Sequence, residues 1–231
     1  MLGYWKASQS PAYNFFLSIV LLIGYEGLIH AVPEASLSGR NLIDLWLQWV
    51  FSSIAPYHWV LSVAVVLMGL AYVYLIRQSR EKLYAWVFGL MLVEGGLWAY
   101  GIWRFLPMLM QVVAAPQAQL SLPSESLHAL ALCMGAGFYE ELFFRFLLVE
   151  GLIWIFTGLR YRKAGFIHII ASWIVSAIIF SALHFLNEPF SWYAFGYRGV
   201  FGLVMSGIYL LRGFGIAAWA HALYDVAVLW L

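Results

Sequence analysis

Long apolar runs follow one another along most of the 231-residue chain, with short polar segments between them. A run of about 17–25 apolar residues is long enough to cross the hydrocarbon core of a bilayer as a helix. The pattern predicts an all-α polytopic membrane protein with seven to eight transmembrane helices. We expect the spans at residues 12–32, 57–76, 84–103, 127–157, 166–185, 198–211 and 214–231.

Three segments depart from this simple pattern. The run at 127–157 is too long for one perpendicular crossing, so we expect it to be tilted or to emerge from the bilayer at one end. The run at 198–211 is short and contains glycine. Residues 41–54 mix acidic and amide side chains with two tryptophans, which favours an interfacial helix over an eighth span.

The composition supports a membrane location. The chain is 64% hydrophobic and 10% charged, whereas soluble domains usually contain roughly 25% charged residues. A net charge of +1 provides no basic field for nucleic acid, and a single cysteine, Cys133, excludes an intrachain disulfide. We see no internal repeat or soluble domain, so we expect one integral domain over 1–231 with the lipid bilayer as its surroundings.

The basic loops indicate the orientation. Cytoplasmic loops of membrane proteins carry an excess of Lys and Arg. Two loops carry such clusters, namely Arg77, Arg80 and Lys82, and Arg160, Arg162 and Lys163. The pattern predicts a multi-pass cell-membrane protein with a cytoplasmic N-terminus and with the loop at Asn187 outside.

Ionisable side chains within the predicted spans indicate a polar intramembrane cavity, because charges in hydrocarbon are costly and usually functional. They are Glu140, Glu141, Arg145, His184, His221 and Asp225. Glu141 and Arg145 are four residues apart and should pair on one face. Glu140 lies about 100° around the helix, so it can face the cavity. Two carboxylates in different environments suit acid–base chemistry, although a structural ion pair beside a protonated carboxyl is the alternative.

The other ionisable groups are more ambiguous. His221 and Asp225 lie four apart, so the carboxylate can fix the tautomer of the imidazole. His184 alone would more often be a hydrogen-bonded core residue. Glu94 precedes two glycines in mid-span and needs a partner there, so it either lines a substrate path or has a structural role.

Taken together, the motifs resemble a known family. Their order on separate spans is similar to that of the CPBP (CAAX-processing and bacteriocin-processing), Rce1-like, intramembrane endopeptidases: Glu140-Glu141-x-x-x-Arg145, Phe180-x-x-x-His184 and His221-x-x-x-Asp225. The resemblance covers about 135–225 and suggests a catalytic core at about 127–231. The chain departs from it at Asp225, where many members carry Asn, and at Phe146, where many carry a small residue.

The resemblance implies a protease that hydrolyses a peptide bond near the C-terminus of a membrane-anchored protein or peptide. Glu140 would activate the water with help from His184. Glu141, held by the arginine, would orient the site, and His221 and Asp225 would stabilise the oxyanion. Phe180, which belongs to the motif, is a candidate for substrate binding. Glu94, from its place in mid-span, is the second candidate for substrate binding.

Several alternatives stay open. Glu140, His184 and His221 could supply three zinc ligands and leave a fourth position open, but no His-Glu-x-x-His helix is present, and we favour a metal-free site. Buried Glu, His and Asp would also suit a proton- or ion-coupled transporter. A non-proteolytic adaptor or immunity protein of the same family is a third possibility. The ordered motifs and the lack of a repeat favour the protease.

The depth of the site residues within the predicted spans indicates the side of the membrane to which the cavity opens. Counted at about 1.5 Å per residue, His184 lies near the outer boundary and Glu140 near mid-depth, whereas His221 lies deeper by on the order of 10 Å. We expect a cavity that opens outward. This fits members of bacterial C-terminal sorting systems, to which the stretch 135–145 is similar. Prenylated substrates would call for a cytoplasmic opening.

The topology can be tested by cysteine accessibility. With Cys133 replaced by Ser, an Asn187→Cys variant should react with a membrane-impermeant thiol reagent added outside intact cells. Protection of that cysteine until the cells are opened would reverse the predicted orientation.

Overall fold

The structure is a computed structural model. It describes residues 3–31, 40–51, 58–76, 82–111, 126–158, 165–186 and 188–231. Every regular element in these ranges is helical, which agrees with the predicted all-α class.

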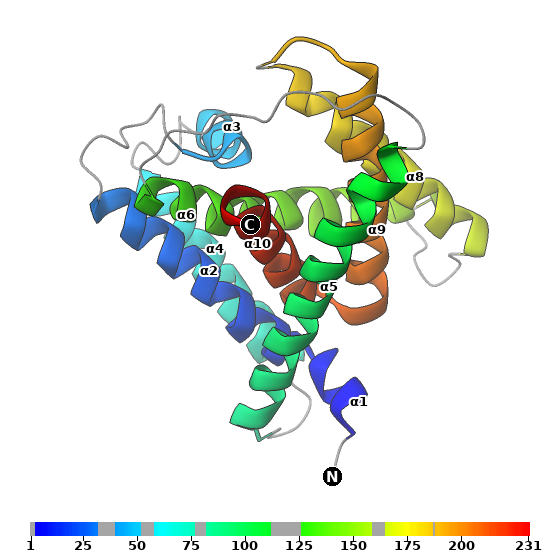
Figure 1. Ribbon diagram of the computed structural model, residues 1–231. Helices are drawn as coiled ribbons and strands as arrows, with labels where there is room; N and C mark the ends of the chain where they lie inside the picture. Colours follow the sequence, from blue (N-terminus) through cyan, green and yellow to red (C-terminus); the bar gives the residue numbers. More distant parts are fainter. Residues whose placement is uncertain are drawn as a thin grey trace.

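The helices follow one another with short connections where the chain is described (Figure 1). In chain order they are α1 (Tyr4–Ser8), α2 (Pro11–Ala31), α3 (Leu42–Phe51), α4 (His58–Ile76), α5 (Ala85–Gln111), α6 (Ser126–Gly135), η2 (Ala136–Glu140), η3 (Leu142–Val149), α7 (Glu150–Phe156), α8 (Phe166–Leu183), η5 (His184–Leu186), α9 (Trp192–Arg212) and α10 (Phe214–Trp230).

Four helices within the described ranges are long and apolar enough to cross a membrane, namely α2, α5, α8 and α9. The protein is therefore a multi-pass membrane protein. α4 and α10 contain shorter apolar stretches, and the count of seven to eight spans stays a prediction. The basic residues at 77–81 and 159–164, and Asn187, lie outside the described residues, so the orientation also stays a prediction.

Two expected boundaries were wrong. The sixth run is not short, because α9 begins at Trp192, six residues before the predicted start, and has 21 residues. The Ser191 side chain caps its first turn by accepting a hydrogen bond from the Ala194 amide at 3.4 Å. α5 continues beyond the predicted end at residue 103, through Pro107 to Gln111.

α3 has ten residues, about 15 Å of helix, which is half of the hydrocarbon thickness. Residues 52–54 lie outside the described residues, so the choice between an interfacial helix and a span for residues 41–54 stays a prediction. However, Asp44 in its first turn is fully buried and faces protein. α3 packs against α4 and η2.

The fourth apolar run forms one continuous helical rod from residue 126 to residue 156. Its middle consists of two π-helical segments, η2 and η3. π-Helical turns are rare and occur frequently at functional sites. The rod runs across the molecule behind α10, roughly transverse to α5 and α9 in Figure 1, which accommodates its length.

α10 is the central helix of the fold. It packs against α5, α2, η2 and α9, and its alanines are buried. The close approach to η2 requires a glycine, since a Cβ atom at Gly137 would lie 2.6 Å from the Ala218 carbonyl oxygen and 2.7 Å from the Ala222 Cβ. Small residues let neighbouring helices meet in this way.

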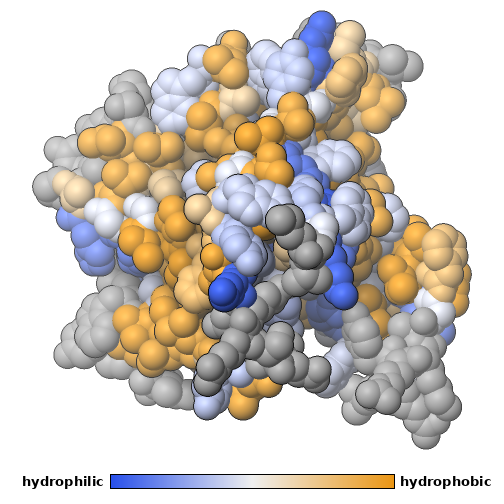
Figure 2. Space-filling model, turned by 90° about the horizontal axis from the view of Figure 1, so that it is seen from below, coloured by the Kyte–Doolittle hydropathy of each residue, from blue (hydrophilic) through white to orange (hydrophobic). Residues whose placement is uncertain are grey.

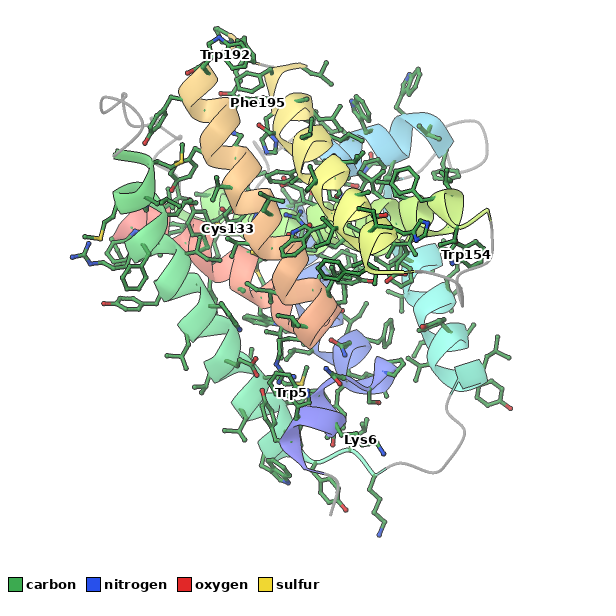
Figure 3. All side chains as sticks on the ribbon, turned by 90° about the vertical axis from the view of Figure 1, so that its right-hand side faces the viewer. Trp5, Lys6, Cys133, Trp154, Trp192 and Phe195 are labelled. Carbon is green, nitrogen blue, oxygen red and sulfur yellow. The ribbon has the colours of Figure 1, made fainter. Side chains whose placement is uncertain are left out.

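The surface and the two ends fit a protein surrounded by lipid. Hydrophobic residues cover broad areas of the face in Figure 2, and hydrophilic residues form smaller patches there. Figure 3 shows Trp5 and Lys6 at one end of the molecule, and Trp192 and Phe195 at the other. Aromatic residues are enriched at both membrane–water interfaces.

The glycine contact gives a test of the fold. Gly137→Ala should lower the free energy of unfolding in detergent by about 1–3 kcal/mol, the usual cost of overpacking. Gly151→Ala is the matched control in the same rod, because no atom lies within 4 Å of its added Cβ. Thermal unfolding should show loss of stability in the first variant alone. Equal behaviour of the two variants would contradict the packing of η2 on α10.

Candidate active site

Glu141 joins the rod to the central helix. Its side chain is fully buried, and its Oε1 atom lies 3.0 Å from Arg145 Nη1. The same oxygen lies 2.6 Å from His221 Nδ1 on α10. The ion pair expected from the i, i+4 spacing is therefore formed, and it extends to a second helix.

Glu140 points to a different place, as the sequence predicted. Its Oε2 atom lies 4.0 Å from His184 Nε2 and 3.9 Å from His221 Nε2. Its Oε1 atom accepts a hydrogen bond of 2.9 Å from the Asn41 side-chain amide. The rod, α10 and the end of α8 thus bring one carboxylate oxygen and two imidazoles together.

The hydrogen bonds determine which imidazole nitrogens carry protons. His184 Nδ1 lies 2.8 Å from the Phe180 carbonyl oxygen, and His221 Nδ1 lies 2.6 Å from the Glu141 carboxylate. Since a carbonyl or carboxylate oxygen can only accept, each Nδ1 carries the hydrogen. In the neutral imidazoles, both Nε2 atoms therefore present lone pairs toward Glu140.

Asp225 does not fix the tautomer of His221, in contrast to the expectation. Its Oδ2 atom lies 3.7 Å from His221 Nε2, beyond hydrogen-bond distance. Glu141 occupies that role from the rod, on the Nδ1 side of the ring. Asp225 instead lies beside the nitrogen that faces Glu140, with 28% of its side chain exposed.

Phe180 packs against both the arginine and His184. Its ring centroid lies 4.7 Å from the Arg145 guanidinium carbon and 4.7 Å from the His184 ring. The ring is 2% exposed, so in this structure it packs on site residues. Contact with a substrate stays a prediction.

Glu94 lies in a different cluster. It forms a bidentate ion pair with Arg212, at 2.5 and 2.7 Å, and accepts a hydrogen bond from Tyr4. Burial raises the pKa of Tyr4 to about 12, and the Glu94 carboxylate adds to the shift, so the hydroxyl remains a donor. These contacts tie α1 and α9 to α5, and the structure does not bring Glu94 together with the six site residues.

Asn41 is the site residue that sequence reasoning missed. It precedes α3 and is held by a neighbouring buried network in which Arg40 pairs with Glu26 and Asp44, each at 2.6 Å. Burial opposes the charge of Arg40, but the carboxylate of Asp44 holds its pKa above the usual range. In the sequence, Asn41 stands out only as an N-cap residue before a short amphipathic segment. An N-cap predicts the start of a helix and does not predict a contact with Glu140.

The geometry of the zinc alternative is less favourable. In the part of the chain that the structure describes, no group of three His, Cys, Asp or Glu side chains is placed to hold a metal ion. Tetrahedral zinc with bonds of about 2.0–2.1 Å would bring donor atoms to about 3.3 Å from one another. The Glu140 oxygen lies 3.9 and 4.0 Å from the two imidazoles, so these residues would have to move closer to share an ion.

Comparison with known proteins agrees with the motifs. Residues 122–227 match the family described as type II CAAX prenyl endopeptidase Rce1-like. No curated protein and no solved structure matches the chain. The match includes all six ionisable site residues and Phe180, whereas Asn41 and Glu94 lie before it. The chain therefore contains a domain of the Rce1-like family of type II CAAX prenyl endopeptidases, at residues 122–227.

Proposed function

We propose that the protein is an intramembrane endopeptidase that hydrolyses a peptide bond near the C-terminus of a membrane-anchored protein or peptide. The observation that supports this most directly is the placement of Glu140 Oε2 about equally far from His184 Nε2 and His221 Nε2, at 4.0 and 3.9 Å. A water molecule bound between Glu140 Oε2 and His184 Nε2 can donate a hydrogen bond to each of them, which positions it for proton transfer to the carboxylate.

In the proposed reaction Glu140 is the general base. Its Oε2 atom takes a proton from water while the water oxygen forms a bond to the carbonyl carbon of the substrate. His184 accepts a hydrogen bond from the same water and orients it. The tetrahedral intermediate then breaks its C–N bond, and the proton held by Glu140 passes to the leaving amine. The products are a carboxylate and an amine.

The oxyanion needs hydrogen-bond donors. The site holds three carboxylates and one guanidinium, so a proton on His221 lowers the net negative charge that is buried there. With Nδ1 bonded to Glu141, the added proton resides on Nε2, where it faces the reacting group. A protonated Asp225 beside it would be a second donor. Glu141 and Arg145 hold this imidazole in place and do not contact the reacting atoms.

The site is accessible near the end opposite the N-terminus. His184 has 26% of its side chain exposed, and the next residue, Phe185, stacks on Phe195 with ring centroids 6.3 Å apart. Phe195 lies at the end opposite Trp5 and Lys6 in Figure 3. With the N-terminus in the cytoplasm, as the basic loops predict, the cavity would open outward. That side suits exported substrates held by a C-terminal hydrophobic anchor.

Glu140→Gln tests the proposed base. The amide is isosteric but cannot take a proton, so cleavage of a candidate membrane-anchored substrate should fall by at least about a hundredfold. Glu150→Gln in the same rod is the matched control, because that carboxylate accepts a hydrogen bond from Tyr209 at 3.0 Å and should leave the rate unchanged. Wild-type cleavage by Glu140→Gln would exclude the proposed mechanism.

Chelation tests the metal-free proposal. Purified enzyme should keep its full activity after incubation with a strong zinc chelator, since Glu140 and the imidazoles act on water directly. Loss of activity that is restored by added Zn²⁺ would instead assign Glu140, His184 and His221 as metal ligands.

A further inference from the structure

We propose that Asn41 is a positioning residue for Glu140, supplied by a part of the chain outside the matched domain. This inference rests on the proposed function, since it concerns the same carboxylate. Asn41 Nδ2 donates a hydrogen bond of 2.9 Å to Glu140 Oε1 across 99 residues of sequence. Both side chains are buried.

The orientation of the Asn41 amide is determined by its other contacts. Its Oδ1 atom accepts hydrogen bonds from the backbone amides of Ile43, at 2.9 Å, and Asp44, at 3.4 Å. These are N-cap bonds to the first turn of α3, which only an acceptor can form. Because the oxygen is committed to the helix, the NH₂ group must point to Glu140.

Asn41 itself has little freedom to move. Its backbone amide donates to the Tyr25 hydroxyl at 3.1 Å, and that hydroxyl donates to Asp44 at 2.7 Å. Arg40, the preceding residue, pairs with Glu26 on α2 and with Asp44 on α3. The donor is thus held on both sides by buried contacts, as a positioning group must be.

The hydrogen bond distinguishes the two oxygens of Glu140. Oε1 is occupied by Asn41, so Oε2 is the atom that faces His184 and His221. Without the donor, the carboxyl group could rotate about its last bond, whose torsional preference is broad. The rod alone therefore places the Glu140 backbone, and Asn41 selects the oxygen that acts as the base.

Two substitutions separate this role from capping. Asn41→Ser keeps a good N-cap acceptor but is too short to donate to Glu140, whereas Asn41→Ala removes both functions. If Asn41 positions the base, kcat should fall about ten- to hundredfold in both variants, the range expected for a hydrogen bond to a charged group, with KM unchanged. Stability should fall mainly in Asn41→Ala.

Asn14→Ser is the matched control. Asn14 is 8% exposed, like Asn41, and its amide bonds the backbone of Ser8, Ser10 and Gly215. This variant should lose stability and keep the wild-type kcat. A wild-type kcat in Asn41→Ser would show that Asn41 is only a helix cap and would overturn the inference.

The same assay distinguishes this inference from the proposed function. If Glu140→Gln is inactive and Asn41→Ser is fully active, the catalytic proposal stands and the positioning role is wrong. If Glu140→Gln cleaves as fast as wild type, the catalytic proposal itself is wrong, and the inference falls with it.

Discussion

The arrangement of the site depends on one carboxylate oxygen, which contacts both a guanidinium and an imidazole. Glu141 Oε1 contacts both Arg145 and His221 while the side chain is fully buried. A buried charge left unpaired costs several kcal/mol, so each of these groups requires the others. The rod and α10 must consequently meet at this level, and Gly137 permits the approach by having no Cβ.

Adjacent glutamates have opposite environments in this fold. Glu141 is enclosed and paired with Arg145, whereas Glu140 keeps 10% of its side chain exposed and accepts a hydrogen bond from the neutral Asn41 amide. Two adjacent carboxylates with such different surroundings suit different roles in acid–base chemistry. Adjacent residues of a helix point about 100° apart, so the two side chains lie on different sides of the rod.

The spacing of residues along the sequence predicted the contacts within one helix. It could not predict the contacts between helices, which depend on the tertiary structure. The i, i+4 rule found Glu141–Arg145, because both side chains lie on the same rod. It failed for His221, whose partner comes from another helix. The depth count placed His221 about 10 Å too far from Glu140, since it treated every run as perpendicular, while the rod lies across its neighbours in Figure 1.

The N-terminal part of the chain contributes to the site in a way that no local pattern shows. A helix of ten residues such as α3 is marginal by itself in water, so its place depends on tertiary contacts. The buried pairs of Arg40 with Glu26 and Asp44 provide them, and ion pairs of this kind are suited to fixing position. The geometry of Glu140 therefore depends on residues that lie outside the matched domain. A chain reduced to residues 122–227 would retain the six ionisable groups and lose the donor that orients one of them.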